Sequence, residues 1–373
     1  MLATAANKYF YIIWSILLSL AGKHQNCMGL YKTLRIASIK SETADCRTFY
    51  LSPADNEQLY YKPGQFLTFV FTKPAGEERR SYSISSTPAL QEPLSITVKR
   101  LENGEYSRKL FDYAKEGDIL TTTGAAGFFV LPEDIQPWKE IFFMAAGSGI
   151  TPVYPLIKTV LYLHPHIRVI LIYSNRSVAT TIFYEELKLL SVLFAGRFIV
   201  EFLFSSAVNL ERARLSKWLL GKLLKEYSRA PRAETLFYTC GPFDYMRMVT
   251  IELLESRVPL QHIKKENFTP LKIESKTLPP DTHTHGVEIQ LQQKIYQLET
   301  QYPQTILQAA KKAGIVLPYS CEAGRCGSCA ATCVKGKVWM SYNEVLMDDE
   351  MEKGRVLTCV GYPINGDVIL KYE

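Results

Sequence analysis

The 373-residue chain lacks any run of lysine or arginine with interleaved aromatic residues, and its net charge is only +6. Nucleic-acid binding therefore has little support, because it depends on a basic patch or stripe. The chain also lacks an internal repeat and a disordered composition, since 47% of its residues are apolar and 21% are charged. At roughly 100 to 200 residues per domain, this length predicts two or three domains.

No apolar segment reaches the roughly 20 residues that a membrane-spanning helix needs. The nearest candidate is Phe10–Ala21, a 12-residue run (FYIIWSILLSLA) that follows Lys8. This length matches a signal-peptide core, but no convincing small-x-small cleavage site follows it. We therefore predict that residues 1–28 are an N-terminal extension outside the folded domains. The alternative is a tether to a membrane surface.

The eight cysteines do not have the spacing of a disulfide framework. Four of them fall as Cys321-x4-Cys326-x2-Cys329, followed by Cys359. Three thiolates on one short loop and a fourth from a distant strand suit the outer coordination sites of a [2Fe–2S] cluster. A zinc site, the main alternative, favours paired C-x2-C knuckles. The cysteines predict an iron–sulfur centre in a reducing compartment, and hence a cytoplasmic location.

Residues 34–124 consist of short alternating runs separated by tight turns. Pro63-Gly64 and Asn103-Gly104 mark two of these turns. Strands separated in this way predict a small antiparallel β-barrel. The runs are 34–38, 48–51, 66–71, 80–85, 94–100 and 119–124.

The sequence pattern changes after Pro137, where runs typical of buried strands alternate with runs typical of helices. Such alternation predicts a parallel sheet with helices on both faces and ligands at the carboxyl ends of its strands. The predicted strands are 140–147, 168–175, 197–205 and 234–241, and the predicted helices are 153–163, 183–193, 214–227 and 243–257.

The last part of the chain follows a polar, proline-bearing linker. Two alternating runs, a helix ended by Gly314, the cysteine loop and short strands around Val338, Leu357 and Val368 predict a compact α+β module. The predicted organisation is a multidomain one: extension 1–28, antiparallel β-barrel 29–134, α/β parallel-sheet domain 135–268, linker 269–285 and α+β domain 286–373.

One barrel strand carries residue types that can hold a flavin. Arg80-Ser81-Tyr82-Ser83 offers a guanidinium for a phosphate, an aromatic ring for the isoalloxazine and a hydroxyl for a ring nitrogen. The same four residues also fit an ordinary half-exposed strand face. Lys99 and Ser107 flank the next turn, where a second phosphate contact could form. Ser107 fits equally well as the N-cap of a short helix.

Two further motifs lie at the predicted ligand edge of the parallel sheet. The segment from Gly147 to Pro152 (GSGITP) follows a buried strand and opens a helix, so its backbone N–H groups favour a pyrophosphate. Pro152 stands where the third glycine of a full G-x-G-x-x-G would come, and a bare G-x-G is also often only a tight turn. Cys240-Gly241-Pro242 ends a later strand at the same edge.

Together and in this order, RxYS, GSGITP, CGP and C-x4-C-x2-C resemble the ferredoxin–NADP reductase superfamily with a ferredoxin domain fused at the carboxyl end. The resemblance covers about residues 30–373. Within the superfamily it is greatest to the phenylacetyl-coenzyme A epoxidase reductase subunit and related oxygenase reductases, through RRSYSIS, SNR…IFYEEL and the order of the cluster domain.

The resemblance implies a β-grasp fold for the cluster domain and a role for each motif. Arg176 would lie at the adenine-side ribose, where its charge favours the 2′-phosphate of NADPH over NADH. The implied FAD-binding residues are Arg80, Tyr82, Ser83, Lys99 and Ser107. The implied nucleotide-binding residues are Gly147, Gly149, Thr151, Pro152, Arg176, Cys240, Gly241 and Pro242, and the implied cluster ligands are Cys321, Cys326, Cys329 and Cys359.

The implied activity is electron transfer from NAD(P)H through FAD to the [2Fe–2S] cluster and on to an acceptor protein, an oxygenase. No catalytic acid or base is predicted, because the cofactors carry this chemistry. One alternative is a relay subunit that is inactive alone, as in dihydroorotate dehydrogenase electron-transfer subunits, although those have a shorter gap than Cys329 to Cys359. Another is a redox sensor without turnover.

One departure from the superfamily concerns the flavin face. Free-standing plant-type reductases end in an aromatic residue that stacks on the flavin, whereas this chain continues through Phe268 into the linker. The sequence therefore leaves open what covers the flavin. Residues 266–268 are one candidate, and they also fit the last strand of the parallel sheet.

Overall fold

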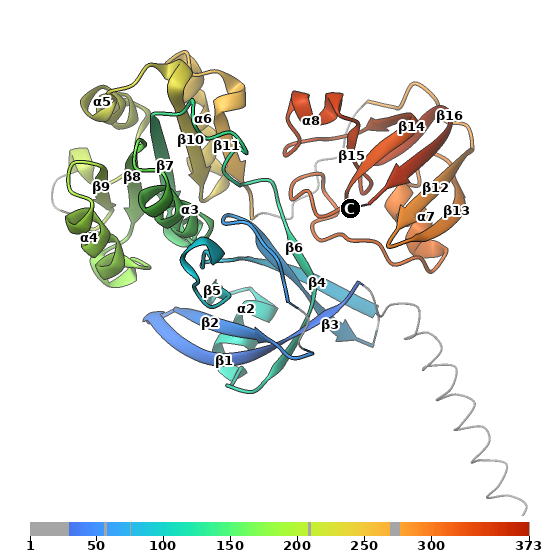
Figure 1. The fold of residues 1–373 in the computed structure, drawn as a ribbon, viewed down its shortest axis with the longest axis horizontal. Coiled ribbons are helices and arrows are strands. Elements are labelled where there is room, and N and C mark those ends of the chain that lie inside the picture. Colours follow the sequence, from blue (N-terminus) through green and yellow to red (C-terminus); the bar gives the residue numbers. More distant parts are fainter. Residues whose placement is uncertain (1–29, 56–57, 75, 208–209, 269–276, 373) are drawn as a thin grey trace, which may run out of the picture.

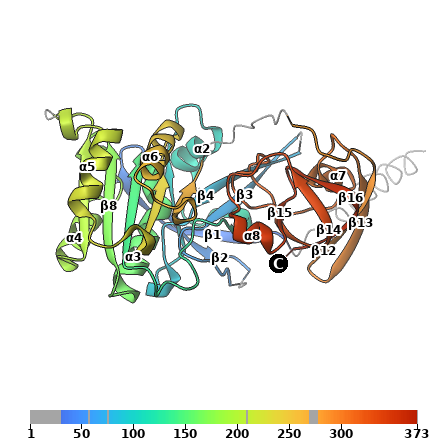
Figure 2. The same cartoon turned by 90° about the horizontal axis from the view of Figure 1, so that it is seen from above.

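The computed structural model describes residues 30–55, 58–74, 76–207, 210–268 and 277–372. The predicted extension with its apolar run, and most of the predicted linker, lie outside these residues. Figure 1 and Figure 2 show three sheet-containing units, with the barrel in contact with each of the other two. Among the described residues, no helix is both long and apolar enough to cross a membrane.

The first unit is the predicted antiparallel barrel. Its strands follow the order β4-β3-β6-β1-β2-β5, and neighbours pair in antiparallel fashion. A bridge between Ile84 and Ile96 joins the two ends of this order and closes the barrel around apolar side chains such as Phe49 and Leu67. The strands are β1 (Lys32–Thr43), β2 (Cys46–Pro53), β3 (Phe66–Lys73), β4 (Gly76–Ser83), β5 (Ser95–Lys99) and β6 (Ile119–Ala126).

Helix α2 (Glu105–Tyr113) crosses the barrel after β5 and corrects one detail of the sequence interpretation. Its N-cap is Gly104, so the N-cap alternative for Ser107 is wrong. The chain enters the helix directly after the Asn103-Gly104 turn, which places Ser107 at the third helical position. The Ser107 hydroxyl accepts a hydrogen bond from the Leu101 backbone N–H (3.1 Å) and donates to the Gly104 carbonyl (3.1 Å), which fixes the turn.

The second unit is the predicted parallel sheet, with strand order β11-β10-β7-β8-β9. Alternate residues of β7 enter two separate hydrophobic clusters: Ile141 and Phe143 face one cluster, whereas Phe142 and Met144 face the other. Helices α3 and α4 cover the first face, and α5 and α6 cover the second. The elements are β7 (Glu140–Ala146), α3 (Ile150–Leu163), β8 (Arg168–Asn175), α4 (Tyr184–Leu193), β9 (Phe198–Phe204), α5 (Lys217–Tyr227), β10 (Thr235–Cys240), α6 (Phe243–Glu255) and β11 (Ile263–Glu266).

The strand order of this sheet reverses between β7 and β10. Strands β8 and β9 extend it on one side of β7, and β10 and β11 extend it on the other. In open α/β sheets, ligands bind in the crevice outside the carboxyl ends of the strands at such a reversal. Here that crevice lies between Ala146, the last residue of β7, and Cys240, the last residue of β10.

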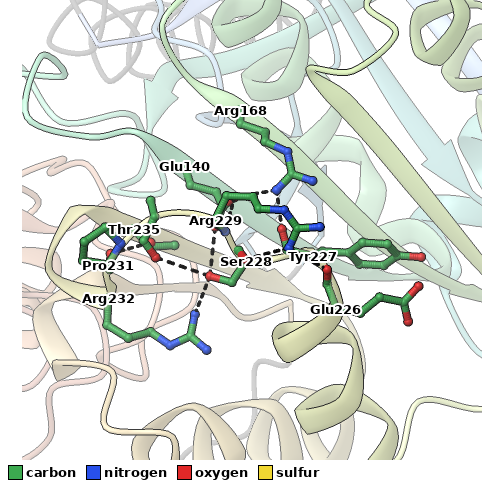
Figure 3. A network of polar contacts seen from close by, with 10 residues as sticks. Glu140, Arg168, Glu226, Tyr227, Ser228, Arg229, Pro231, Arg232 and Thr235 are labelled. Carbon is green, nitrogen blue, oxygen red and sulfur yellow. Dashed lines mark hydrogen bonds and ion pairs between the residues drawn. The ribbon is translucent and has the colours of Figure 1, made fainter.

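A polar network lies at the opposite, amino edge of the same sheet (Figure 3). The carboxylate of Glu140, only 1% exposed, accepts hydrogen bonds from the Arg168 guanidinium (2.7 Å), the Ser228 hydroxyl (3.1 Å) and the Arg229 backbone N–H (3.2 Å). Arg232 donates to Ser228 in turn (2.9 Å). These contacts satisfy the buried charge of Glu140 and join the loop before β10 to the start of β7. We therefore assign the network a structural role.

The third unit is a mixed sheet with strand order β13-β12-β16-β14-β15, in which β12 and β16 are parallel and the other neighbours antiparallel. This confirms the predicted α+β module. Strand β12 begins at His285, one residue earlier than predicted, and Thr305 caps α7 through a hydrogen bond with Gln308. The elements are β12 (His285–Leu291), β13 (Lys294–Thr300), α7 (Ile306–Lys312), β14 (Ala330–Met340), α8 (Asp348–Glu352), β15 (Arg355–Leu357) and β16 (Gly361–Lys371).

Candidate functional site

The four predicted ligand thiols meet beside the third sheet. Cys321, Cys326 and Cys329 lie on the loop between α7 and β14, and Cys359 lies between β15 and β16. The thiol of Cys321 contacts those of Cys326 and Cys359, and Cys359 also contacts Cys329. No three metal-binding side chains surround a single ion position within the described residues. Four thiols gathered at one place can supply the four outer ligands of a [2Fe–2S] cluster.

The surroundings of Cys321 favour a thiolate. Hydrogen bonds with the thiols of Cys326 and Cys359 lower its pKa against the opposing effect of burial, and the backbone N–H groups of Arg325 and Ala323 lower it further. The Ala323 nitrogen lies 3.4 Å from the sulfur. The same thiol contacts raise the pKa of Cys326 and of Cys359, so within this interacting group the negative charge is favoured at Cys321, the sulfur that the backbone N–H groups face.

Two glycines let the cysteine loop pack closely. Gly324 has a φ of +70°, and a Cβ there would lie 2.8 Å from the Tyr342 carbonyl oxygen. Gly327 has a φ of +74°, and a Cβ there would lie 2.5 Å from the ring of Phe128, just beyond the last barrel strand. A side chain at either position would push the loop away, so the loop and the barrel are in direct contact because of Gly327.

A cavity of about 370 Å³ lies between the barrel, the end of β11 and the cysteine loop. It brings residues of the predicted flavin motif and two predicted cluster ligands to one enclosed space. The lining includes Arg80, Ser83, Glu266, Phe268, Cys321 and Cys326. A flavin held by the RxYS motif would therefore have the cluster loop as a direct neighbour.

The three residues of the flavin motif are placed differently. The Arg80 guanidinium lies 5.0 Å from the ring centre of Tyr106 and donates to the Glu78 carboxylate (3.0 Å). The Tyr82 ring packs against the barrel core, 6.1 Å from the ring of Phe69, and does not line the cavity described above. Ser83 is buried and ends the strand inside that cavity.

Sequence reasoning missed the partner of Ser83. Its hydroxyl donates to the carboxylate of Glu266 (3.1 Å), whose residue is 8% exposed. Burial raises the pKa of Glu266 to about 8, although the hydrogen bond from Ser83 acts in the opposite direction. Glu266 also pairs with Cys240 across β10 and β11. The only sequence signal was an acidic residue at the end of a short strand, next to the candidate aromatic Phe268.

A second cavity, of about 1050 Å³, lies at the carboxyl edge of the parallel sheet. Its lining includes Gly147, Gly149, Gly241 and Pro242 from the two predicted motifs. Gly149 has no room for a side chain, because a Cβ there would lie 2.0 Å from the Cys240 carbonyl oxygen. The two motifs are thus in backbone contact at the crevice where the strand order reverses.

Helix α3 begins directly after Gly149, which lines this cavity, whereas Thr151 and Pro152 do not. Thr151 and Pro152 lie buried in its first turn, and the Thr151 hydroxyl donates to the Ser148 carbonyl (2.9 Å). Gly147 has a φ of +54°, with open space where a Cβ would point. An accessible glycine turn leading into a helix N-terminus suits a pyrophosphate, so the residues present fit a dinucleotide.

The remaining predicted residues lie in different places. Lys99 lines the second cavity, where its ammonium lies 3.4 Å from the Asp45 carboxylate. Ser107 lines neither cavity. Arg176 lines the second cavity together with Arg214, which the sequence interpretation did not name. Phe268 lines both cavities and so lies between the two proposed cofactor sites.

Comparison with known protein families matches each unit to one cofactor. The family described as "Oxidoreductase FAD-binding domain" matches residues 33–131. "Oxidoreductase NAD-binding domain" matches residues 143–250, and "2Fe-2S iron-sulfur cluster binding domain" matches residues 289–363. The cofactors predicted from the motifs, namely FAD, NAD(P)H and a [2Fe–2S] cluster, are confirmed.

Curated relatives match nearly the whole chain. The ferredoxin reductase component of 3-ketosteroid-9-alpha-monooxygenase from Mycobacterium tuberculosis is 30% identical, over 91% of this chain and 95% of the relative. A subunit of 1,2-phenylacetyl-CoA epoxidase from Escherichia coli is 29% identical, over 93% of this chain and 99% of the relative. Phthalate dioxygenase reductase shares the fold, with a TM-score of 0.56 and 23% identity over 92% of this chain and 98% of that one.

The three units and their sites define an NAD(P)H-dependent flavin and iron–sulfur oxidoreductase. Within that class, the chain belongs to the ferredoxin reductase components that carry FAD-binding, NAD-binding and [2Fe–2S] domains on one polypeptide.

Proposed function

We propose that this chain is the reductase component of an oxygenase system, located in the cytoplasm, that delivers electrons from NADPH to an oxygenase of the phenylacetyl-CoA epoxidase kind. The observation that carries the proposal is the cavity shared by Ser83 of the flavin motif and Cys321 and Cys326 of the cluster loop. Relatives named as oxygenase reductase components support the choice of acceptor. When bound, FAD takes a hydride from NADPH and releases its electrons singly.

The chain's own residues would bind and orient these groups. We assign Arg80, Tyr82 and Ser83 to FAD, and Cys321, Cys326, Cys329 and Cys359 to the cluster. We assign Gly147, Gly149, Thr151, Pro152, Arg176, Cys240, Gly241 and Pro242 to the nucleotide. Lys99 and Ser107 stay predicted flavin contacts, and Ser107 would act through the turn that it fixes. The corresponding domains are 29–134, 135–268 and 286–373.

The decisive test is an anaerobic titration of the purified, reconstituted chain with NADPH. We expect the flavin absorbance to bleach first and the cluster absorbance to follow, without any other protein present. Gel filtration of the same sample distinguishes a self-sufficient reductase from a relay subunit that needs a larger complex. A chain that binds FAD and iron but shows no nucleotide-dependent bleaching would contradict the proposal.

The choice between NADPH and NADH depends on the two arginines in the second cavity. Both arginines are exposed and line this cavity, where their guanidinium groups can bind a 2′-phosphate. We expect Arg176→Ala combined with Arg214→Ala to raise KM for NADPH by about 10- to 100-fold, as for the loss of charged hydrogen bonds, with little change for NADH. Arg212→Ala is the matched control, because Arg212 pairs with Glu201 (2.9 Å) outside the cavity. Equal losses with both nucleotides would contradict this assignment.

A further inference from the structure

Strand β4 presents different side chains on its two faces. Successive side chains of a strand point in opposite directions, so Arg80 and Tyr82 of the flavin motif share one face, while Arg79, Ser81 and Ser83 share the other. In both views, β3 and β4 are the barrel strands next to the C-terminal unit (Figure 1, Figure 2). The second face therefore meets the domain that carries the cysteines.

Arg79 reaches across this boundary. Arg79 is only 5% exposed, and its guanidinium donates to the backbone carbonyls of Leu317 (3.1 Å) and Tyr319 (3.3 Å). The guanidinium also lies 3.7 Å from the ring centre of Tyr319. Planar stacking combined with a forked set of donors is a geometry that arginine provides and lysine does not. The partner residues precede the first predicted cluster ligand, Cys321, by two and four positions.

Ser81 makes a second link one step further along the strand. Its hydroxyl lies 2.7 Å from the hydroxyl of Ser320, the residue directly before Cys321. It also lies 2.9 Å from the hydroxyl of Thr68 on β3, so the contact is anchored inside the barrel. The antiparallel register of β3 and β4, with Thr68 opposite Ser81 and Val70 opposite Arg79, fixes both side chains relative to the flavin motif.

Burying the Arg79 guanidinium at this boundary costs free energy. Removing a guanidinium from water carries a desolvation penalty that hydrogen bonds to neutral carbonyls only partly offset, so a buried arginine is weak evidence for overall stability. It is stronger evidence for a single relative position of two parts, because in any other position Arg79 would lose both carbonyls of the cysteine domain and keep its barrel partners, the Glu77 carboxylate (3.5 Å) and the Tyr31 hydroxyl (3.3 Å). The cysteine loop is thereby held in one position against the strand that carries Tyr82 and Ser83.

We propose that Arg79 and Ser81 are positioning residues that fix the cluster loop for direct electron transfer from the flavin. The inference builds on the proposed function. One hydride from NADPH supplies two electrons, which leave the flavin singly; each converts one ferric ion of the cluster to ferrous, and the hydride's proton goes to solvent after both have left. With FAD and the cluster bound, the acceptor would remove the first electron before the second could enter.

The test compares internal electron transfer in the holoprotein after rapid anaerobic mixing with NADPH. Flavin bleaching reports the first step, and the electron paramagnetic resonance signal of the reduced cluster in frozen time points reports the second. We expect Arg79→Gln to leave the first step unchanged and to slow the second at least ~10-fold, the factor that corresponds to ~1.4 kcal/mol. Ser81→Ala should slow the second step less, and Arg79→Lys should restore part of the rate.

Arg35→Gln on β1 is the matched control. Arg35 is exposed and donates to the Gly117 carbonyl within the same domain (3.2 Å), so both rates should equal those of the parent. A merely structural role for Arg79 would lower FAD content, iron content or stability but leave the internal rate of the loaded protein unchanged. The internal rate therefore decides between the two roles.

Two outcomes would overturn the inference. Parental transfer rates in Arg79→Gln with full FAD and iron content would refute it while leaving the proposed function intact. If Arg79→Gln does not fold, parental rates in both Ser81→Ala and Arg79→Lys would refute it equally. Absence of flavin bleaching in the parent chain would instead refute the proposed function itself.

Discussion

Replacement of Cys359 by serine is expected to eliminate the [2Fe–2S] cluster and every electron transfer that depends on it, while NADPH still bleaches the flavin. Cys359 lies between β15 and β16, away from the loop that carries the other three cysteines, and its thiol contacts those of both Cys321 and Cys329. A serine hydroxyl is a poor substitute for a thiolate toward iron, so the cluster would lose the ligand that closes its second side. The loss is measured by the iron content, by the electron paramagnetic resonance signal of the reduced cluster and by an assay of acceptor reduction.

Cys333→Ser is the matched control for this variant. Cys333 lies nearby on β14, is half-buried and donates its thiol hydrogen bond to the Lys335 carbonyl (3.3 Å) rather than joining the other thiols. We expect this variant to keep full iron content and full acceptor reduction. A Cys359→Ser protein with the parental iron content and cluster signal would show that the four-thiol assignment is wrong.

The second large effect concerns stability and pH at Glu266. Burial raises the pKa of its carboxyl from 4.5 to about 8 in the folded chain. Below the unfolded pKa both states are protonated and the group costs nothing. As pH rises from about 4.5 to about 8, the Glu266 carboxyl ionises in the unfolded chain before it ionises in the folded one, so the free energy of unfolding falls. The loss approaches on the order of 5 kcal/mol above the folded pKa.

Glu266→Gln should remove this loss, because an amide keeps the shape and the hydrogen bond to Ser83 but does not ionise. We expect little difference from the parent at about pH 5 and a higher unfolding free energy for the variant at about pH 9. Chemical denaturation with saturating FAD measures both. Glu133→Gln is the control, since the Glu133 side chain is 95% exposed. A difference between variant and parent that is independent of pH would contradict the raised pKa.

Most of the fold followed from periodicity in the sequence. Alternation between residues 34 and 124 predicted the barrel strands, and the buried runs after Pro137 predicted the parallel sheet. The two-sided burial of β7, with Phe142 and Phe143 in different clusters, is what such an uninterrupted apolar run requires. Helix starts were less certain, because at Ser107 a turn glycine took the N-cap position in place of the hydroxyl.

The candidate site was predicted only where its signals are local. Cysteine spacing and glycine turns reflect the geometry of one loop, so they can be recognised without neighbours. The contacts of Ser83 with Glu266 and of Arg79 with Tyr319 join residues 183 and 240 positions apart. Adjacent arginines, Arg79 and Arg80, look alike in the sequence. Which of them enters another domain is decided by how the barrel and the third sheet pack.

The two-faced character of β4 also constrains how such a chain can evolve. A slip of β4 by one residue against β3 would exchange the two faces. Arg80 and Tyr82 would then point toward the cluster domain, while Arg79 and Ser81 would point away from it and lose their contacts with Tyr319 and Ser320. A one-residue slip would thus break both links between the barrel and the cysteine loop at once, whereas Arg79→Gln or Ser81→Ala removes only one of them.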